Sequence, residues 1–113
     1  PSYQPSLEGV ALDIPPNPFV PDRGEKIQIR YNAGAVNNQI TIRIFDLGGR
    51  LVTVLLDEQA QLLVNTLDWN GKNQYYDFVP LGTYLCHLEV LEPVSGKKRV
   101  KTAPIVVGTI LKK

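Results

Sequence analysis

The sequence predicts an all-β fold, an antiparallel β-sandwich of the immunoglobulin-like, fibronectin type III-like kind, with about seven strands. Three observations indicate this fold. Apolar residues recur at alternate positions in short segments, and turn residues separate these segments at short intervals. No segment has the three- and four-residue apolar spacing of an amphipathic helix. The length of 113 residues is that of one domain.

The first part of the chain predicts two strands. Residues 8–14 form a short strand that ends at a proline-rich stretch beginning with Pro15, because proline has a fixed φ angle and no N–H. Residues 26–31 alternate clearly between apolar and polar side chains, as a half-buried strand does. The face predicted to be buried carries Ile27, Ile29 and Tyr31.

The middle of the chain predicts a β-hairpin. Residues 39–46 and 51–56 are its strands, and the glycines in residues 47–50 accept the positive φ angles of a tight turn. In the first strand, Thr41 and Arg43 are predicted to point outward. The inward side chains of that strand are Ile40, Ile42 and Ile44.

The last part of the chain predicts three more strands. Residues 62–69 are strand-like and end at a polar stretch with a glycine, residues 70–73. Residues 83–91 and 97–107 form two further strands around the turn at residues 93–96. One face of the strand at 83–91 carries Tyr84, Cys86, Leu88 and Val90, and the other carries Leu85, His87, Glu89 and Leu91.

Composition and charge exclude several classes of function. The chain is 43% hydrophobic and 20% charged, which is a globular balance, so it should fold. The net charge of +1 provides no field for nucleic acid or an anionic membrane. No apolar run approaches the ~20 residues that span a bilayer. We therefore expect neither a nucleic-acid partner nor membrane insertion.

Cys86 and His87 are the one cysteine and the one histidine of the chain. A single cysteine forms no intramolecular disulfide. Neighbouring strand residues point to opposite faces, so the two side chains should diverge rather than form a nucleophilic or metal-binding pair. The sequence predicts a small core residue beside an exposed histidine.

Four segments together resemble one known family. They are residues 16–19, 42–52, 69–72 and 79–84, and they resemble the FlgD-type immunoglobulin-like domain, named for the flagellar hook-capping protein. Similar domains lie at the C-termini of many secreted proteins of the Bacteroidetes and related phyla, where some are sorting signals for type IX secretion. The residues that carry the resemblance are Asn17, Pro18, Phe19, Asp46, Gly49, Trp69, Gly71, Gly82 and Tyr84.

The resemblance implies a non-catalytic β-sandwich with no active site and no cofactor, near the end of a multi-domain exported bacterial protein. Such modules serve as spacers, assembly contacts or export tags. The resemblance covers residues 7–107, which leaves residues 1–6 as a linker from a preceding domain and residues 108–113 as a C-terminal tail. Residues 104–107 resemble the closing strand of such modules. The family usually has a second glycine where this chain has Tyr76, so we expect a rebuilt turn there.

Simple physical roles can be assigned to three of these residues. Trp69 should bury a large apolar surface while its indole N–H finds a backbone acceptor. Gly71 suits the following turn, and Gly82 should let the chain pass a bulky neighbour as it enters the next strand. Together they would close one end of the sandwich. The alternative is a sugar-binding platform of exposed rings, which would consist of Trp69, Tyr75, Tyr76 and Phe78.

Two weaker constellations remain. Six aspartates lie beside predicted turns, where short carboxylates cap backbone N–H groups. A calcium site assembled from separate loops stays open as an alternative, although no EF-hand spacing is present. The basic residues of the last strand, Lys97, Lys98, Arg99 and Lys101, predict a solvated edge that discourages unwanted pairing. The aspartates are Asp13, Asp22, Asp46, Asp57, Asp68 and Asp77.

The leading functional hypothesis is a structural or interaction module whose partners are other domains of its own polypeptide. Neighbouring subunits or secretion components could pair with the predicted edge strands at residues 8–14 and 103–111. A carbohydrate- or surface-binding module, an appendage subunit and an enzyme fragment are the rivals. The leading hypothesis predicts no deep polar pocket and no cluster of titratable groups.

Overall fold

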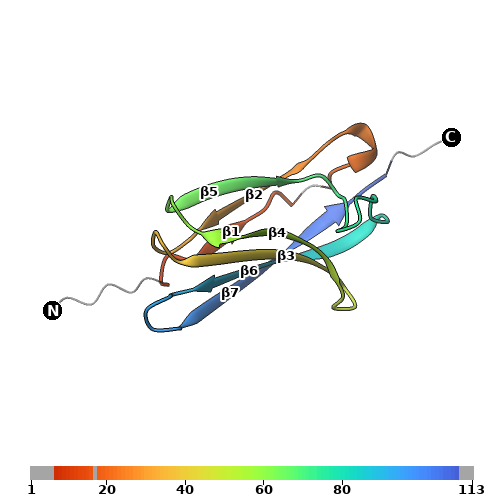
Figure 1. Ribbon diagram of the computed structural model, residues 1–113. Helices are drawn as coiled ribbons and strands as arrows, with labels where there is room; N and C mark the ends of the chain where they lie inside the picture. The colour runs from red at the N-terminus through yellow and green to blue at the C-terminus, as the bar shows by residue number, and fades with distance from the viewer. Residues whose placement is uncertain (1–6, 17, 110–113) are drawn as a thin grey trace.

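The computed structural model describes residues 7–16 and 18–109, which form seven strands in two antiparallel sheets (Figure 1). The strands are β1 (Ala11–Asp13), β2 (Ile27–Asn32), β3 (Gln39–Asp46), β4 (Leu51–Gln59), β5 (Val64–Trp69), β6 (Gly82–Leu91) and β7 (Lys98–Val107). A three-stranded sheet, β1-β2-β5, packs on a four-stranded sheet, β4-β3-β6-β7. The prediction of an all-β immunoglobulin-like sandwich is confirmed.

Several boundaries differ from the predicted ones. β1 starts at Ala11 rather than at residue 8, because the chain turns beforehand through a hydrogen bond from Val10 N–H to Leu7 O of 3.2 Å. β4 runs on to Gln59, beyond the predicted end at residue 56. The unpredicted 3-10 turn η1 (Pro21–Arg23) follows the proline-rich stretch. Gly24, at φ 80°, ends this turn.

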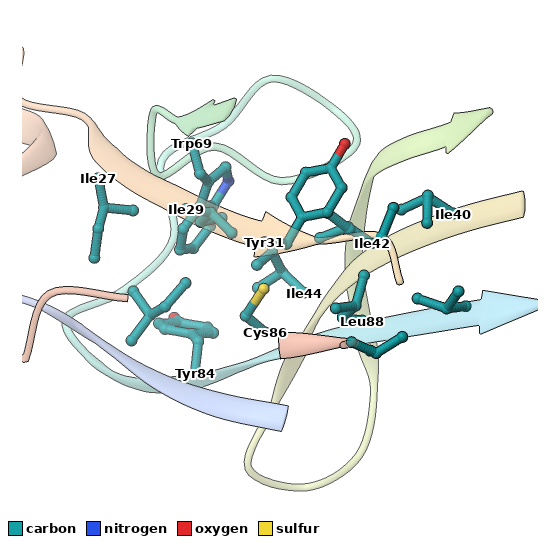
Figure 2. Packing of buried hydrophobic residues seen from close by; sticks show 14 of the residues in the cluster. Ile27, Ile29, Tyr31, Ile40, Ile42, Ile44, Trp69, Tyr84, Cys86 and Leu88 are labelled. Carbon is teal, nitrogen blue, oxygen red and sulfur yellow. The ribbon is translucent and has the colours of Figure 1, made fainter. Parts of the chain in front are cut away.

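The core lies between the two sheets and is made by the predicted alternation (Figure 2). In β2 the buried and exposed side chains alternate, and in β6 the predicted inner face is buried throughout. The three isoleucines of β3 are fully buried. The core side chains drawn with labels are Ile27, Ile29, Tyr31, Ile40, Ile42, Ile44, Trp69, Tyr84, Cys86 and Leu88.

Thr41 is the residue of β3 whose predicted exposure is wrong. It points away from the inner face but is only 6% exposed, because β4 and β6 flank β3 on both sides. Its hydroxyl donates a hydrogen bond of 3.3 Å to Asp57 Oδ1 of β4. A buried polar side chain needs such a partner, since an unsatisfied hydroxyl would destabilise the fold.

β7 is an edge strand, but its C-terminal part is not free. Phe19 N–H donates to Val106 O at 3.1 Å, and Gly108 N–H donates to Phe19 O at 2.8 Å. The prediction that the backbone of residues 103–111 is open for pairing is therefore wrong at residues 106–108, and residues 110 and 111 lie outside the described ones. Pro104 faces this same outer side, where strand pairing within the sheet loses no N–H donor.

The chain enters the sandwich at one end and leaves it at the opposite end (Figure 1). The turn between β3 and β4, the turn η1, the segment of residues 70–81 and the finish of β7 all gather at the exit. We call this the loop end. Eight of the nine residues that carry the family resemblance lie in these segments or directly beside them; the ninth, Asn17, falls outside the described residues.

Candidate functional site at the loop end

Trp69 is the centre of the loop end. It is the last residue of β5 and is 1% exposed. Its indole N–H donates to Lys72 O at 2.9 Å, as the sequence predicts. Its ring contacts those of Phe19, at a centroid distance of 5.7 Å, and Tyr84, at 5.9 Å. The three rings join the proline-rich segment, β5 and β6, and Figure 2 shows Trp69 and Tyr84 facing the same interior.

Gly71 follows Trp69 at a φ angle of 79°, which favours glycine. There is a second reason for glycine here. A Cβ atom at this position would lie 2.4 Å from Pro21 Cγ and 2.8 Å from Pro21 Cβ. The turn after β5 therefore packs directly on η1, and any side chain at position 71 would push them apart.

Gly82 has a different role from the predicted one. A Cβ atom here would meet nothing within 4 Å, so no bulky neighbour requires a glycine. The requirement is conformational, because Gly82 enters β6 at a φ angle of 147°, which other residues rarely adopt.

The hydroxyl of Tyr84 closes the loop that precedes β6. It donates a hydrogen bond of 2.7 Å to Pro80 O. Burial, and to a lesser degree the negative charge of Asp46, raises the pKa of the Tyr84 phenol above its usual value of 10. A tyrosine at the start of a strand that bonds back to the backbone just upstream is the tyrosine corner of immunoglobulin-like sandwiches.

Asp46 and Gly49 shape the turn between β3 and β4. Gly49 has a φ angle of 87°. Asp46 Oδ1 accepts the N–H of Arg50 at 2.9 Å, and Asp46 Oδ2 lies 3.3 Å from Arg50 Nε. The backbone hydrogen bond from Arg50 is the main reason that the pKa of Asp46 lies below its usual value. Asp46 is thus a turn-capping carboxylate, in line with the predicted role of the aspartates.

The tip of the 70–81 segment is a small turn organised by Asn73. The side-chain oxygen of Asn73 accepts the N–H groups of Tyr75, at 2.8 Å, and Asp77, at 3.1 Å. Tyr76 has a φ angle of 68°. Tyr76 therefore keeps a backbone conformation that favours glycine, although it is not a glycine. The backbone angle at this position is not rebuilt.

The predicted four-ring platform does not form, because Trp69 is in the core. The other three rings are exposed: Tyr75 by 73%, Tyr76 by 82% and Phe78 by 51%. The Phe78 ring lies under the ammonium of Lys72, 5.0 Å from its centroid. Three of the four rings of the predicted platform are therefore exposed at the tip, without Trp69.

An open hollow of ≈ 270 Å³ lies between the β3–β4 turn and the tip. It is lined by side chains that include Asp46, Leu51, Tyr75, Pro80 and Tyr84. Two of its polar side chains are engaged within the chain, because Asp46 accepts the N–H of Arg50 and Tyr84 donates to Pro80 O. The hollow offers shape and apolar surface but no poised acid, base or nucleophile.

Cys86 and His87 point to opposite faces of β6, as predicted. Cys86 is fully buried, and burial raises the pKa of its thiol to about 12, so the thiol stays protonated at neutral pH. His87 is partly buried rather than exposed as predicted, and it stacks edge-on against Phe45 on the outer face, with centroids 5.6 Å apart. The two side chains cannot act on one substrate atom.

The other predicted constellations are spread over the surface. Within the part of the chain that the structure describes, no three His, Cys, Asp or Glu side chains come together as metal ligands. Lys98, Arg99 and Lys101 are exposed at the start of β7. Among these same described residues there is no helix of the length and hydropathy needed to cross a bilayer.

Sequence reasoning missed two features of the loop end. Pro21 packs against Gly71. The two residues are 50 positions apart, so no local pattern in the sequence indicates this contact. Asn73 organises the tip, and the signal was present, because asparagine followed by a polar and aromatic stretch is typical of a side chain that caps nearby N–H groups.

Comparison with solved structures finds the same fold elsewhere. The structure of FlgD from P. aeruginosa superposes with a TM-score of 0.59 and 18% identity, over 73% of this chain and 61% of the FlgD chain. The structure of PorZ, a surface component of the type IX secretion system of Porphyromonas gingivalis, gives a TM-score of 0.48 and 24% identity, over 89% of this chain and 12% of PorZ. No protein-family model and no curated protein matches the sequence. The likeness to FlgD confirms the predicted resemblance at the level of the fold.

Proposed function

We propose that the chain is a non-catalytic, extracellular immunoglobulin-like module of a secreted or cell-surface bacterial protein. In this proposal residues 7–107 are the folded unit, residues 1–6 are a linker and residues 108–113 are a tail. The module works as a structural spacer or assembly contact, and the resemblance to type IX sorting domains adds the role of a C-terminal export signal.

The observation that carries this proposal is the course of the chain through the sandwich. The polypeptide enters at one end and leaves at the other, so that neighbouring domains would be held apart by the length of the strands (Figure 1). The loop end supports it, because Trp69, Phe19 and Tyr84 fill the end with packed rings rather than with reactive groups. Two polar side chains of the hollow, Asp46 and Tyr84, are hydrogen-bonded within the chain.

Two experiments test the spacer and export roles separately. Tandem copies of the chain, measured by small-angle X-ray scattering, should lengthen by a constant amount per copy if the module is a spacer. A secreted reporter carrying the chain at its C-terminus should reach the surface of a type IX-secreting bacterium, and removal of residues 108–113 should abolish this. A reporter retained in the periplasm would exclude the export role and leave the spacer role in place.

The exposed rings favour one second candidate, a carbohydrate- or surface-binding module. Tyr75, Tyr76 and Phe78 lie within four positions, and aromatic faces stack on sugar rings. A glycan array with the isolated chain tests this candidate. Binding that disappears in a variant with all three rings changed to alanine would support it, and silence across the array would remove it.

A further inference from the structure

Two edges of the four-stranded sheet carry opposite charges. β4 carries Asp57 and Glu58 just before its last residue, and β7 begins with Lys98 and Arg99, with Lys101 further along. All five side chains are exposed. β4 and β7 are the outermost strands on opposite sides of the same sheet. The molecule therefore presents an acidic edge and a basic edge, one on each side.

Both edges have backbone groups that point away from the sheet and that no hydrogen bond from another described residue occupies. Ala60 exchanges hydrogen bonds with residues 37 and 38, beside β3, so the alternation along β4 points the N–H and C=O groups of Asp57 and Gln59 away from the sheet. On β7, Val106 O faces outward to Phe19. The same alternation points the backbone groups of Lys98 and Val100 outward. These groups lie beyond the part of β7 that Phe19 covers.

The acidic residues of β4 and the basic residues of β7 also lie in the same rows across the sheet. Strand pairing aligns Glu58 of β4 through Ile40 and Val90 with Arg99 of β7 in a single row across the sheet. The rows on either side align Gln59 with Lys98 and Asp57 with Val100. A second copy placed beside the first in the same orientation would bring its β7 antiparallel to β4. Outward backbone groups would then face outward backbone groups, and Glu58 would face Arg99.

We infer that the two edges are docking surfaces for further copies of the chain. The end of β4 in one copy pairs with residues 98–101 of the next copy. This inference rests on the assembly role proposed above. Pairing of β7 with β7 would set Arg99 and Lys101 against like charges, and pairing of β4 with β4 would oppose carboxylates. The charges therefore disfavour both symmetric arrangements. The contact is head-to-tail and leaves one edge of each sheet open for a further copy.

The surface available for pairing is short. Irregular register interrupts the β3–β4 ladder between Ile42 and Arg43 and between Ile44 and Phe45, and Gln74 N–H occupies Val52 O on the outer side of β4. Pairing is therefore limited to the last residues of β4. We expect a weak association that low ionic strength strengthens, because most of its specificity comes from exposed charge pairs.

The test uses charge reversal in the whole chain. Sedimentation equilibrium at high protein concentration and low salt should show a mass that rises with concentration. Glu58→Arg or Arg99→Glu alone should weaken association by roughly tenfold, because each places like charges across the contact. An equimolar mixture of the two variants should recover it, since each unchanged edge then meets a partner of opposite charge. Glu8→Arg and Lys26→Glu carry the same charge changes off these edges and should behave as wild type.

A backbone variant tests the pairing without changing charge. Val100→Pro removes one outward N–H, and Pro104 shows that β7 accepts proline on this side. It should weaken association, whereas Thr102→Pro, beyond the contact, should not. Thermal unfolding of each variant checks that it is folded.

Three outcomes would overturn the inference. They are a wild-type chain that stays monomeric, a Glu58→Arg variant that associates normally, and a mixture that fails to recover association. A monomeric chain that still passes the spacer or export test would leave the proposed function intact.

Discussion

The base and the tip of the 70–81 segment differ sharply although they are a few residues apart. At the base, Trp69 is 1% exposed and Gly71 touches Pro21. At the tip, Tyr76 is 82% exposed and adopts a φ angle of 68°. At the base, packing fixes which side chains can be present. At the tip, backbone N–H groups bound by the Asn73 side chain hold the turn, and the other side chains remain exposed. Residues that fix the fold and residues available for contact can therefore be separated by mutation.

Replacement of Trp69 by alanine should have the largest effect. The change removes the ring that joins Phe19 to Tyr84 and the hydrogen bond to Lys72 O, so the free energy of unfolding should fall by about 3–5 kcal/mol. Urea denaturation followed by circular dichroism measures it. Tyr75→Ala at the tip is the control and should stay within about 0.5 kcal/mol of wild type. Equal losses in both variants would remove the distinction between base and tip.

Gly71→Ala should come next. The new Cβ atom collides with Pro21 and sits at a positive φ angle, which together should destabilise the fold by about 2–4 kcal/mol. Gly49→Ala is a matched control, because its φ angle is 87° and a Cβ atom there meets nothing within 4 Å. The difference between the two variants in a chemical denaturation series measures the collision alone. If they lose the same stability, the contact between the turn and η1 carries no energy.

Tyr84→Phe should have a smaller effect, since it removes only the hydrogen bond to Pro80 O. We expect a loss of about 1 kcal/mol at pH 7. The phenol pKa is raised in the folded chain, so the folded state holds this proton more tightly than the unfolded state does. Its contribution is complete below pH 10 and declines above it. The stability difference between wild type and variant, measured from pH 7 to pH 11, should therefore narrow above pH 10.

Tyr76→Gly should have the smallest effect and the opposite sign. Glycine adopts the positive φ angle without strain, so the variant should be more stable by about 0.5–1 kcal/mol. Tyr75→Gly, at a position without a positive φ angle, should be slightly less stable than wild type. A thermal denaturation series can compare the pair. A destabilised Tyr76→Gly variant would mean that this ring packs at the tip after all.

Local patterns predicted the strands and the inner faces well, because alternation is a property of neighbouring residues. The buried isoleucines of β3, the inner face of β6 and the acceptor of the Trp69 indole followed from such patterns. Features that depend on contacts between distant segments did not. Thr41 is buried because β4 and β6 both flank it. Phe19 covers the end of β7, although it lies 87 positions before Val106 in the sequence.

The candidate site was predictable in part for the same reason. Most of the residues singled out lie at one end of the sandwich, and the sequence order of their motifs was enough to group them. The reason for Gly82 was wrong, since the requirement there is a backbone angle rather than a crowded neighbour. The opposite charges of β4 and β7 were visible in the sequence, but their alignment in one row depends on the strand order.

The bridge between Phe19 and the end of β7 has a mechanical consequence. This bridge is parallel, and it joins a segment near the start of the fold to its last strand. If the chain is stretched between its two ends, the paired segments are pulled past each other, so the hydrogen bonds from Phe19 to Val106 and from Gly108 to Phe19, which lie across the direction of pull, are loaded in shear at the same time. Bonds loaded together resist more force than bonds that open one after another, so this short contact would hold the sandwich closed under tension.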